Sequence, residues 1–256
     1  MEVNLYKMIN VIIPSYKRSH DLKGKDYFAM AKYCIPESQK DEYLKVLPED
    51  RIILLPDNQD GSITRKRNWI LKNIPRPLIM IDDDVEKMMY WDNRKEGYLK
   101  TEFPQILLNE LFDSFVDLAE QFEVKLFGVA QNGDDRTYKE NIPFNLTNIV
   151  LGPFQGHLEH DLKFDDNVGS KDDYDMSLQQ LRKYSKILRI NKYCYICEHG
   201  DNKGGIVSYR TKEKEIEYCK NIMLKWGKKI ISYKLPPKKM VDLLNASKVN
   251  IPIKGV

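Results

Sequence analysis

Short apolar runs and longer helical patterns alternate along most of the chain. Each short run is too short for a helix, and several end at proline or glycine, which is typical of buried strands. These runs cover residues 10–13, 51–55, 78–81, 124–130, 146–151 and 192–197. Apolar residues at helical spacing predict helices over 63–74, 107–122, 174–188 and 211–226, with shorter ones within 27–33 and 41–46. The polar segment 92–101 is expected to be a loop. Strands that alternate with helices predict an α/β fold.

An acidic stretch follows the strand predicted at 78–81. Asp82, Asp83 and Asp84 come directly after it. Strand side chains alternate, so we expect Asp82 and Asp84 to point to one side and Asp83 to the other. Two neighbouring carboxylates repel each other unless a cation lies between them. Oxygen ligands suit Mg²⁺ or Mn²⁺, which complete their shells with water and substrate phosphate. A solvated acidic turn is the alternative explanation.

The first predicted strand leads into a polar loop. Pro14, Ser15, Tyr16 and Arg18 lie there, at the edge where open α/β sheets bind ligands. Tyr16 could stack on a base, and Arg18 could pair with a phosphate.

A second group of cations opens the helix predicted at 63–74. Ser62 is expected to cap this helix, and Arg65 and Arg67 occupy its first turns. Cations at this end oppose the helix dipole, which a bound phosphate would relieve. Exposed arginines without a ligand would explain them equally well.

A second acidic stretch precedes the helix predicted at 174–188. Asp172 and Asp173 suit a helix N-terminus on dipole grounds alone. They could also face the same cleft as Asp82 and Asp84, where one of them would act as a general base.

His199 follows a predicted strand and precedes a glycine-rich loop. With Cys194 and Cys197 it suggests a zinc site. We reject zinc because no fourth ligand lies near in sequence and alternating cysteines in a strand usually pack in the core.

Composition indicates a globular protein, with 42% hydrophobic and 31% charged residues among 256. No long apolar segment and no leading signal pattern occurs, so we expect a cytoplasmic protein with no membrane partner. The charge is uneven: residues 181–256 hold 18 Lys and Arg against 6 Asp and Glu, whereas residues 1–180 hold 23 against 32. A basic last third fits a polyanionic partner, although solvated lysine faces would also explain it.

Taken in order, these motifs resemble the nucleotide-sugar-dependent glycosyltransferases of the GT-A fold, over most of residues 9–205. The run at 172–181 and the loop at 203–205 look most like the phage-type TET-associated glycosyltransferases, which act on hydroxymethylated pyrimidines in DNA. One departure is Asp172-Asp173 where many relatives have Glu-Asp, which leaves the choice of base open.

The resemblance implies a fold, a reaction and a set of roles. The fold would be a single Rossmann-like GT-A sheet flanked by helices, with a catalytic domain at 1–205 and a C-terminal helix and basic extension at 206–256 packed on it. A UDP-sugar would donate to a hydroxyl of DNA, in host cytoplasm if the protein is phage-encoded. Mn²⁺ or Mg²⁺ would be held by Asp82, Asp84 and His199, and Asp173 or Asp172 would be catalytic. Nucleotide-sugar ligands would be Pro14, Ser15, Tyr16, Arg18, Arg65, Arg67, Asp82 and Asp83.

Three alternatives stay open. The same fold could act on a glycan or protein acceptor. A nucleotidyltransferase also uses paired aspartates and Mg²⁺, although a glycine-rich loop after the first strand, which would favour it, is missing. A nucleic-acid-binding module with an inactive site is the third. The sugar, the stereochemistry and the oligomeric state are not determined.

Overall fold

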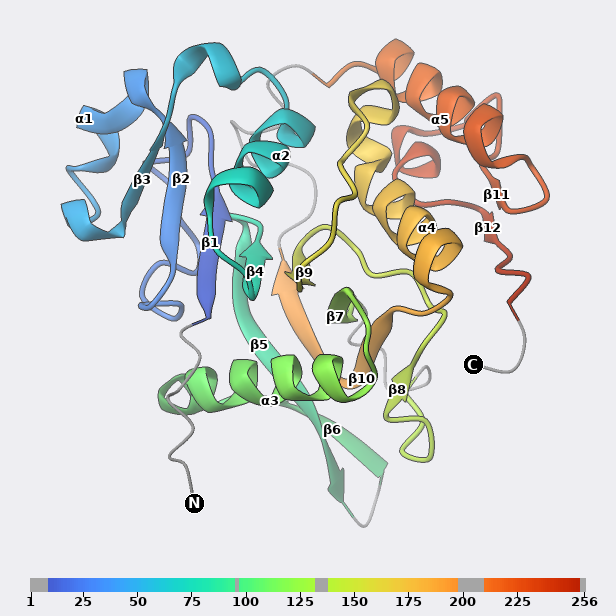
Figure 1. The fold of residues 1–256 in the computed structure, drawn as a ribbon, viewed down its shortest axis with the longest axis horizontal. Helices are drawn as coiled ribbons and strands as arrows, with labels where there is room; N and C mark the ends of the chain where they lie inside the picture. Colours follow the sequence, from blue (N-terminus) through green and yellow to red (C-terminus); the bar gives the residue numbers. More distant parts are fainter. Residues whose placement is uncertain (1–8, 95–96, 132–137, 198–209, 254–256) are drawn as a thin grey trace.

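A mixed β-sheet runs through the molecule (Figure 1). The computed structural model describes residues 9–94, 97–131, 138–197 and 210–253. Within them, ten strands form the sheet in the order β3-β2-β1-β4-β9-β7-β10-β5-β6, and β8 pairs with β10. The strands are β1 (Asn10–Pro14), β2 (Lys32–Pro36), β3 (Ile52–Leu55), β4 (Leu78–Ile81), β5 (Val85–Arg94), β6 (Gly97–Glu102), β7 (Leu126–Ala130), β8 (Phe144–Asn145), β9 (Phe154–His157) and β10 (Leu188–Cys197).

Helices cover both faces of this sheet. The helices are α1 (Lys40–Tyr43), α2 (Ile63–Asn73), α3 (Leu108–Gln121), α4 (Asp172–Tyr184) and α5 (Lys212–Trp226). The apolar face of α3 packs in one core cluster with Ile79 and Ile81 of β4. Leu78 and Met80, the alternate residues of the same strand, pack in a second cluster with α2 and α4. A strand that is apolar on both faces therefore lies between two helical layers, and the predicted α/β class is confirmed.

The strand directions bring the carboxyl ends of β1, β4, β7 and β10 to one edge. β1 is parallel to β4, and β7 is parallel to β10. β9 lies antiparallel between β4 and β7, so these two also run in the same direction. The loops after β1, β4 and β7 therefore leave the sheet at a common edge, where ligands bind in such sheets.

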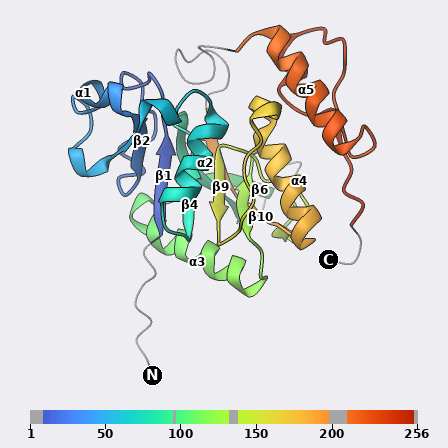
Figure 2. The same cartoon turned by 45° about the horizontal axis from the view of Figure 1, so that its top comes forward.

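The C-terminal part packs beyond α4. α5 lies on the outer side of α4 (Figures 1 and 2) and shares a third apolar cluster with it and with the small ribbon of β11 (Ile231–Ser232) and β12 (Lys248–Val249). Glu215 of α5 accepts hydrogen bonds from Lys171 at 2.7 Å and from Arg210 at 3.0 Å. The boundary predicted at 205/206 lies outside the described residues, so the division into two parts stays a prediction.

Several predicted elements are wrong. Residues 23–30 form turns and not a helix, and they lead into β2. The expected loop at 92–101 is largely the β5–β6 hairpin, whose outer end projects from the sheet (Figure 1) and so needs no apolar alternation. Residues 146–151 form no strand, because Asn145 Oδ1 binds the main-chain N–H groups of Thr147 and Asn148 in place of a ladder. Leu188 lies in β10 and not on the preceding helix.

None of the helices among the described residues is long and apolar enough to span a membrane.

Candidate active site

The acidic triplet lies where β4 turns into β5. β4 ends at Ile81, so strand alternation does not extend through the triplet as predicted. Asp83 is buried and faces the loop after β1, where it accepts hydrogen bonds from Ser15 Oγ and Arg18 Nη1, both at 2.6 Å. Burial raises the pKa of Asp83 to about 7, although Arg18 and Ser15 act to lower it. The central carboxylate therefore fastens two loops together.

Arg67 joins the two acidic stretches. Its Nη1 donates to Asp172 Oδ2 at 2.7 Å, and its Nη2 donates to Asp82 Oδ1 at 2.8 Å. The side chains of Arg67 and Asp172 are each 4% exposed. Burial by itself lowers the pKa of Arg67, but Asp172 and Asp82 raise it overall. The arginine predicted as a nucleotide-sugar ligand is thus committed to a buried ion-pair network.

Asp172 and Asp173 open α4 in different environments. Burial raises the pKa of Asp172 to about 6 despite its pairing with Arg67. Asp173 is less buried and accepts from the main-chain N–H groups of Gly152, at 3.0 Å, and Tyr174, at 2.7 Å. Burial raises the pKa of Asp173 as well, although these N–H groups act to lower it. A carboxylate held by the main chain with a raised pKa suits a general base.

The loop after β1 is held from several sides. The Ser15 carbonyl accepts from Lys66 Nζ at 2.5 Å, and Ser15 Oγ contacts Tyr43 Oη at 2.7 Å. Pro14, the last residue of β1, is buried. Tyr16 is partly exposed, with the Lys66 ammonium 5.6 Å from its ring centre. Among the residues predicted in this loop, Tyr16 is partly exposed, whereas Pro14, Ser15 and Arg18 are buried.

Arg65 lies apart from this network. Its side chain is 59% exposed and pairs with Asp166 at 3.1 Å. Ser62 caps α2 as predicted, accepting from Arg65 N. The structure therefore brings Arg67, but not Arg65, to the carboxylates.

A family model described as TET-Associated Glycosyltransferase matches residues 10–205, which is more than half of the chain. The chain belongs to the TET-associated glycosyltransferase family. The resemblance drawn from the motifs is thereby confirmed, and with it glycosyl transfer as the class of activity. No curated protein matches. Among solved structures, CMP:2-keto-3-deoxy-manno-octonic acid synthetase complexed with CTP is similar at 8% identity, with 85% of this chain and 98% of that chain covered and a TM-score of 0.31.

In this TET-associated glycosyltransferase, Asp82 and Asp84 are candidate metal ligands. Among the described residues Asp82 Oδ2 accepts no hydrogen bond, and Asp84 Oδ1 accepts from the Cys197 thiol at 3.0 Å. No group of three or more His, Cys, Asp or Glu side chains is placed to hold a metal within the described ranges, and His199 lies outside them. Mg²⁺ is commonly held by one or two carboxylates, with water and substrate phosphate completing the shell. Two aspartates fit that donor set.

Residues outside the predicted set also support this site. Lys66 and Tyr43 hold the loop after β1. Gly152 contributes a carbonyl that accepts from Arg67 at 3.3 Å, and a Cβ built there would lie 3.0 Å from Arg67 Nη2. The charged run at 65–67 gave a signal for Lys66, but no local pattern marks Tyr43 or Gly152.

Proposed function

We propose that this chain transfers a sugar from a UDP-sugar to the hydroxyl of a 5-hydroxymethylpyrimidine in DNA. One observation carries the proposal: carboxylates from two stretches about ninety residues apart meet at one sheet edge, joined by Arg67. Family membership supplies glycosyl transfer as the reaction class. We name the acidic cluster as Asp82, Asp83, Asp84, Asp172 and Asp173.

The donor would bind between the loop after β1 and the triplet. Tyr16 would stack on uracil, and Asp83 would hold Ser15 and Arg18 in the geometry that binding needs. Asp82 and Asp84 would hold Mn²⁺ or Mg²⁺, with His199 as a further candidate ligand. When bound, such a cation stabilises the negative charge that a departing diphosphate acquires.

The acceptor hydroxyl must lose its proton as it attacks the sugar. We assign this proton to Asp173, because it is the less buried of the two aspartates and its oxygens are oriented by main-chain N–H groups. Asp172 instead fixes Arg67 and so keeps the two acidic stretches together. Transfer with inversion at the sugar carbon would need no protein nucleophile, because the acceptor hydroxyl itself attacks and Asp173 takes its proton.

The basic last third supports DNA as the acceptor. Residues 181–256 hold 18 Lys and Arg against 6 acids. Lys212, Lys220, Lys228 and Lys229 are exposed on α5 or just after it. Exposed lysines on an outer helix suit contacts with phosphates, which are independent of sequence and weaken with salt.

The test is UDP release from a panel of UDP-sugars with Mn²⁺. Each would be mixed with hydroxymethylated DNA, with unmodified DNA or with no acceptor. Asp84→Asn should abolish release, and Asp50→Asn, which changes an exposed aspartate on the surface, should leave it intact. Release that needs hydroxymethylated DNA supports the proposal. Equal release under all three conditions contradicts hydroxymethylated DNA as the substrate.

A further inference from the structure

A cavity of about 430 Å³ opens beside the carboxyl end of β7. This volume lies within the range of about 300–1,000 Å³ typical of small-molecule sites. The cavity exists because β10 leaves its ladder with β7 between Ile190 and Cys194, where the register shifts. The segment 138–151 closes it, held to β10 by β8 and by main-chain hydrogen bonds from Asn191 and Lys192 to the Pro143 carbonyl. We name it the Arg189 cavity.

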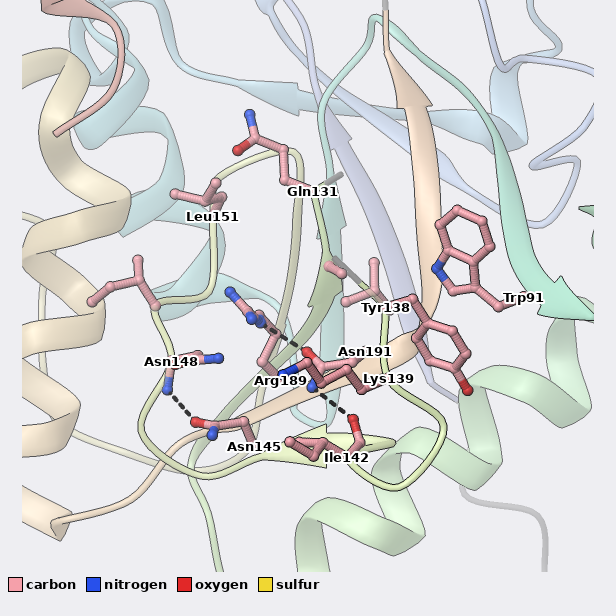
Figure 3. Close-up of a pocket in the computed structure, with 13 residues that line it drawn as sticks. Trp91, Gln131, Tyr138, Lys139, Ile142, Asn145, Asn148, Leu151, Arg189 and Asn191 are labelled. Atoms are coloured by element: carbon pink, nitrogen blue, oxygen red, sulfur yellow. Dashed lines mark hydrogen bonds between the residues drawn. The ribbon is translucent and has the colours of Figure 1, made fainter. Parts of the chain in front are cut away.

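Arg189 lies in the middle of the residues that line this cavity (Figure 3). Its Nε donates to Asn191 Oδ1 at 3.0 Å, and Asn191 Nδ2 donates to the Ile142 carbonyl at 3.1 Å, which fixes the pair. The terminal nitrogens of Arg189 have no hydrogen bond or ion pair to another described residue, and no described acid lines the cavity. Burial lowers the pKa of Arg189, and no carboxylate among the described residues offsets this effect. A partly desolvated guanidinium without an acid is poised for an anion.

The remaining walls suit a planar polar group. Trp91 and Tyr138 stack with ring centres 5.6 Å apart and planes at 12°, which gives an aromatic side. Asn145, Asn148 and Gln131 supply neutral amides. The side-chain amide of Asn148 makes no hydrogen bond to another described residue. Amides can pair with the edge of a base without regard to net charge.

The cavity adjoins the acidic cluster. Leu151 lines it, and the next residue, Gly152, binds Asp173 through its N–H and Arg67 through its carbonyl. A ligand in the cavity is therefore next to the segment that orients Asp173, the proposed general base. Chemistry on a base in DNA requires that the base leave the stack and enter a pocket.

We propose that the Arg189 cavity receives one extruded nucleotide of the acceptor strand, with its phosphate on Arg189 and its base among the asparagine amides. This inference rests on the proposed function, because it takes the acceptor to be DNA. The shared chemistry is a phosphate anion, which the donor diphosphate could also supply, so the experiment separates the two sources.

The experiment is calorimetric titration of the full chain with three probes. These are 5-hydroxymethyl-2′-deoxycytidine 5′-monophosphate, the same nucleoside without phosphate, and UDP. Arg189→Gln should weaken binding of the monophosphate about 10- to 100-fold, since it removes a charge-assisted contact, while nucleoside and UDP affinities stay within about 2-fold. Asn148→Asp, which is isosteric and adds a carboxylate, should weaken the monophosphate in the same way. Arg182→Gln, at an exposed arginine of α4, is the matched control.

Three results overturn the assignment: no monophosphate binding by the unmodified chain, equal monophosphate affinity in Arg189→Gln, or a loss of UDP affinity in its place. Failure of the cavity and failure of the proposed function are distinguishable. DNA glycosylation by Arg189→Gln with an unchanged KM for DNA contradicts the cavity and leaves the function standing. Arg189-dependent monophosphate binding without any DNA glycosylation contradicts the proposed function and leaves the cavity as a nucleotide site.

Discussion

Arg67 is buried and Arg189 is partly buried, and their surroundings are opposite. Arg67 lies between Asp82 and Asp172, with each of its terminal nitrogens on a carboxylate. Arg189 has an amide on Nε and no acid among the described residues around it. At the acidic cluster, the positive charge of Arg67 is neutralised by carboxylates of the protein itself. In the Arg189 cavity the balance is left to a ligand.

This difference separates a charged side chain that stabilises the fold from one that is available to bind a ligand. A buried ion pair is expensive to break, because removing one partner leaves the other charged and desolvated. Arg189 pairs with no acid among the described residues, so its removal leaves only the neutral Asn191 oxygen without its donor, and the loss should be felt in binding more than in stability.

Asp173→Asn should reduce kcat by about 10²- to 10⁴-fold, the usual contribution of a positioned general base. Asn keeps the size of Asp, but its one side-chain oxygen can accept from only one of the N–H groups of Gly152 and Tyr174. The variant should therefore lose about 1–3 kcal/mol of stability while its UDP affinity stays unchanged. Steady-state kinetics with hydroxymethylated DNA would measure the loss. A variant that kept more than about a tenth of kcat would remove Asp173 as the base and turn attention to Asp172.

Arg67→Gln should destabilise the protein by about 3–5 kcal/mol, because Asp172 would stay buried without its partner. Arg65→Gln, two residues earlier on the same helix, removes an exposed pair and should cost less than about 1 kcal/mol. Arg189→Gln should resemble Arg65→Gln in stability. Urea unfolding of the three variants measures the contrast, which would collapse if Arg67→Gln and Arg189→Gln had equal effects.

The parts of the fold with strong apolar signals could be predicted from the sequence. The run before Asp82 and the periodic apolar face of α3 identify their elements, because both sides of β4 and one stripe of α3 are buried. β9 and the β5–β6 hairpin were missed. β9 is short and contains Gln155 and His157, whose burial depends on distant residues that cover them.

The residues of the acidic cluster could be predicted from the sequence, but the contacts between them could not. Asp82, Asp83, Asp172 and Asp173 were all chosen from local motifs. The contact between Arg67 and Asp172 spans 105 residues, and no local pattern encodes it. Arg189 was missed because a single arginine in an apolar strand is typical of ordinary alternation. Arg189 stands out only in the structure, where no acid among the described residues lies around it.

Removal of divalent cations should weaken UDP-sugar binding by at least about 10-fold, since a metal on a diphosphate contributes several kcal/mol. Asp84→Asn should give a similar loss. Binding of the monophosphate probe at the Arg189 cavity should not respond to chelation, because a guanidinium needs no metal to hold phosphate. Titrations with and without EDTA would test this. If chelation weakened both ligands equally, the two regions would not be independent binding sites.

His157 is a buried basic side chain that can lose its proton and become neutral. The guanidinium of Arg189 cannot do so and stays charged. His157 faces His160 at 3.0 Å, with Arg76 and Arg67 nearby and no acid among the causes that shift its titration. His160 Nδ1 accepts from the Leu162 N–H, so neutral His160 donates from Nε2 to His157 Nδ1. Burial holds the pKa of His157 well below its usual value and lowers that of His160 to about 4.

The sign of the resulting pH dependence follows directly. As pH falls below about 6.5, the unfolded chain protonates at residue 157 before the folded chain does, so stability is lost. The loss from this residue should grow as pH falls further, because the folded-state pKa of His157 lies well below that of the unfolded chain. His157→Asn keeps an acceptor near the position of Nδ1 and cannot titrate. Its free energy of unfolding should therefore fall less between about pH 6.5 and 5 than that of the unmodified chain. If urea unfolding showed the same change in the free energy of unfolding with pH for both proteins, His157 would not be the source of the pH dependence. Burial without a nearby acid would then not suffice to keep a basic side chain neutral.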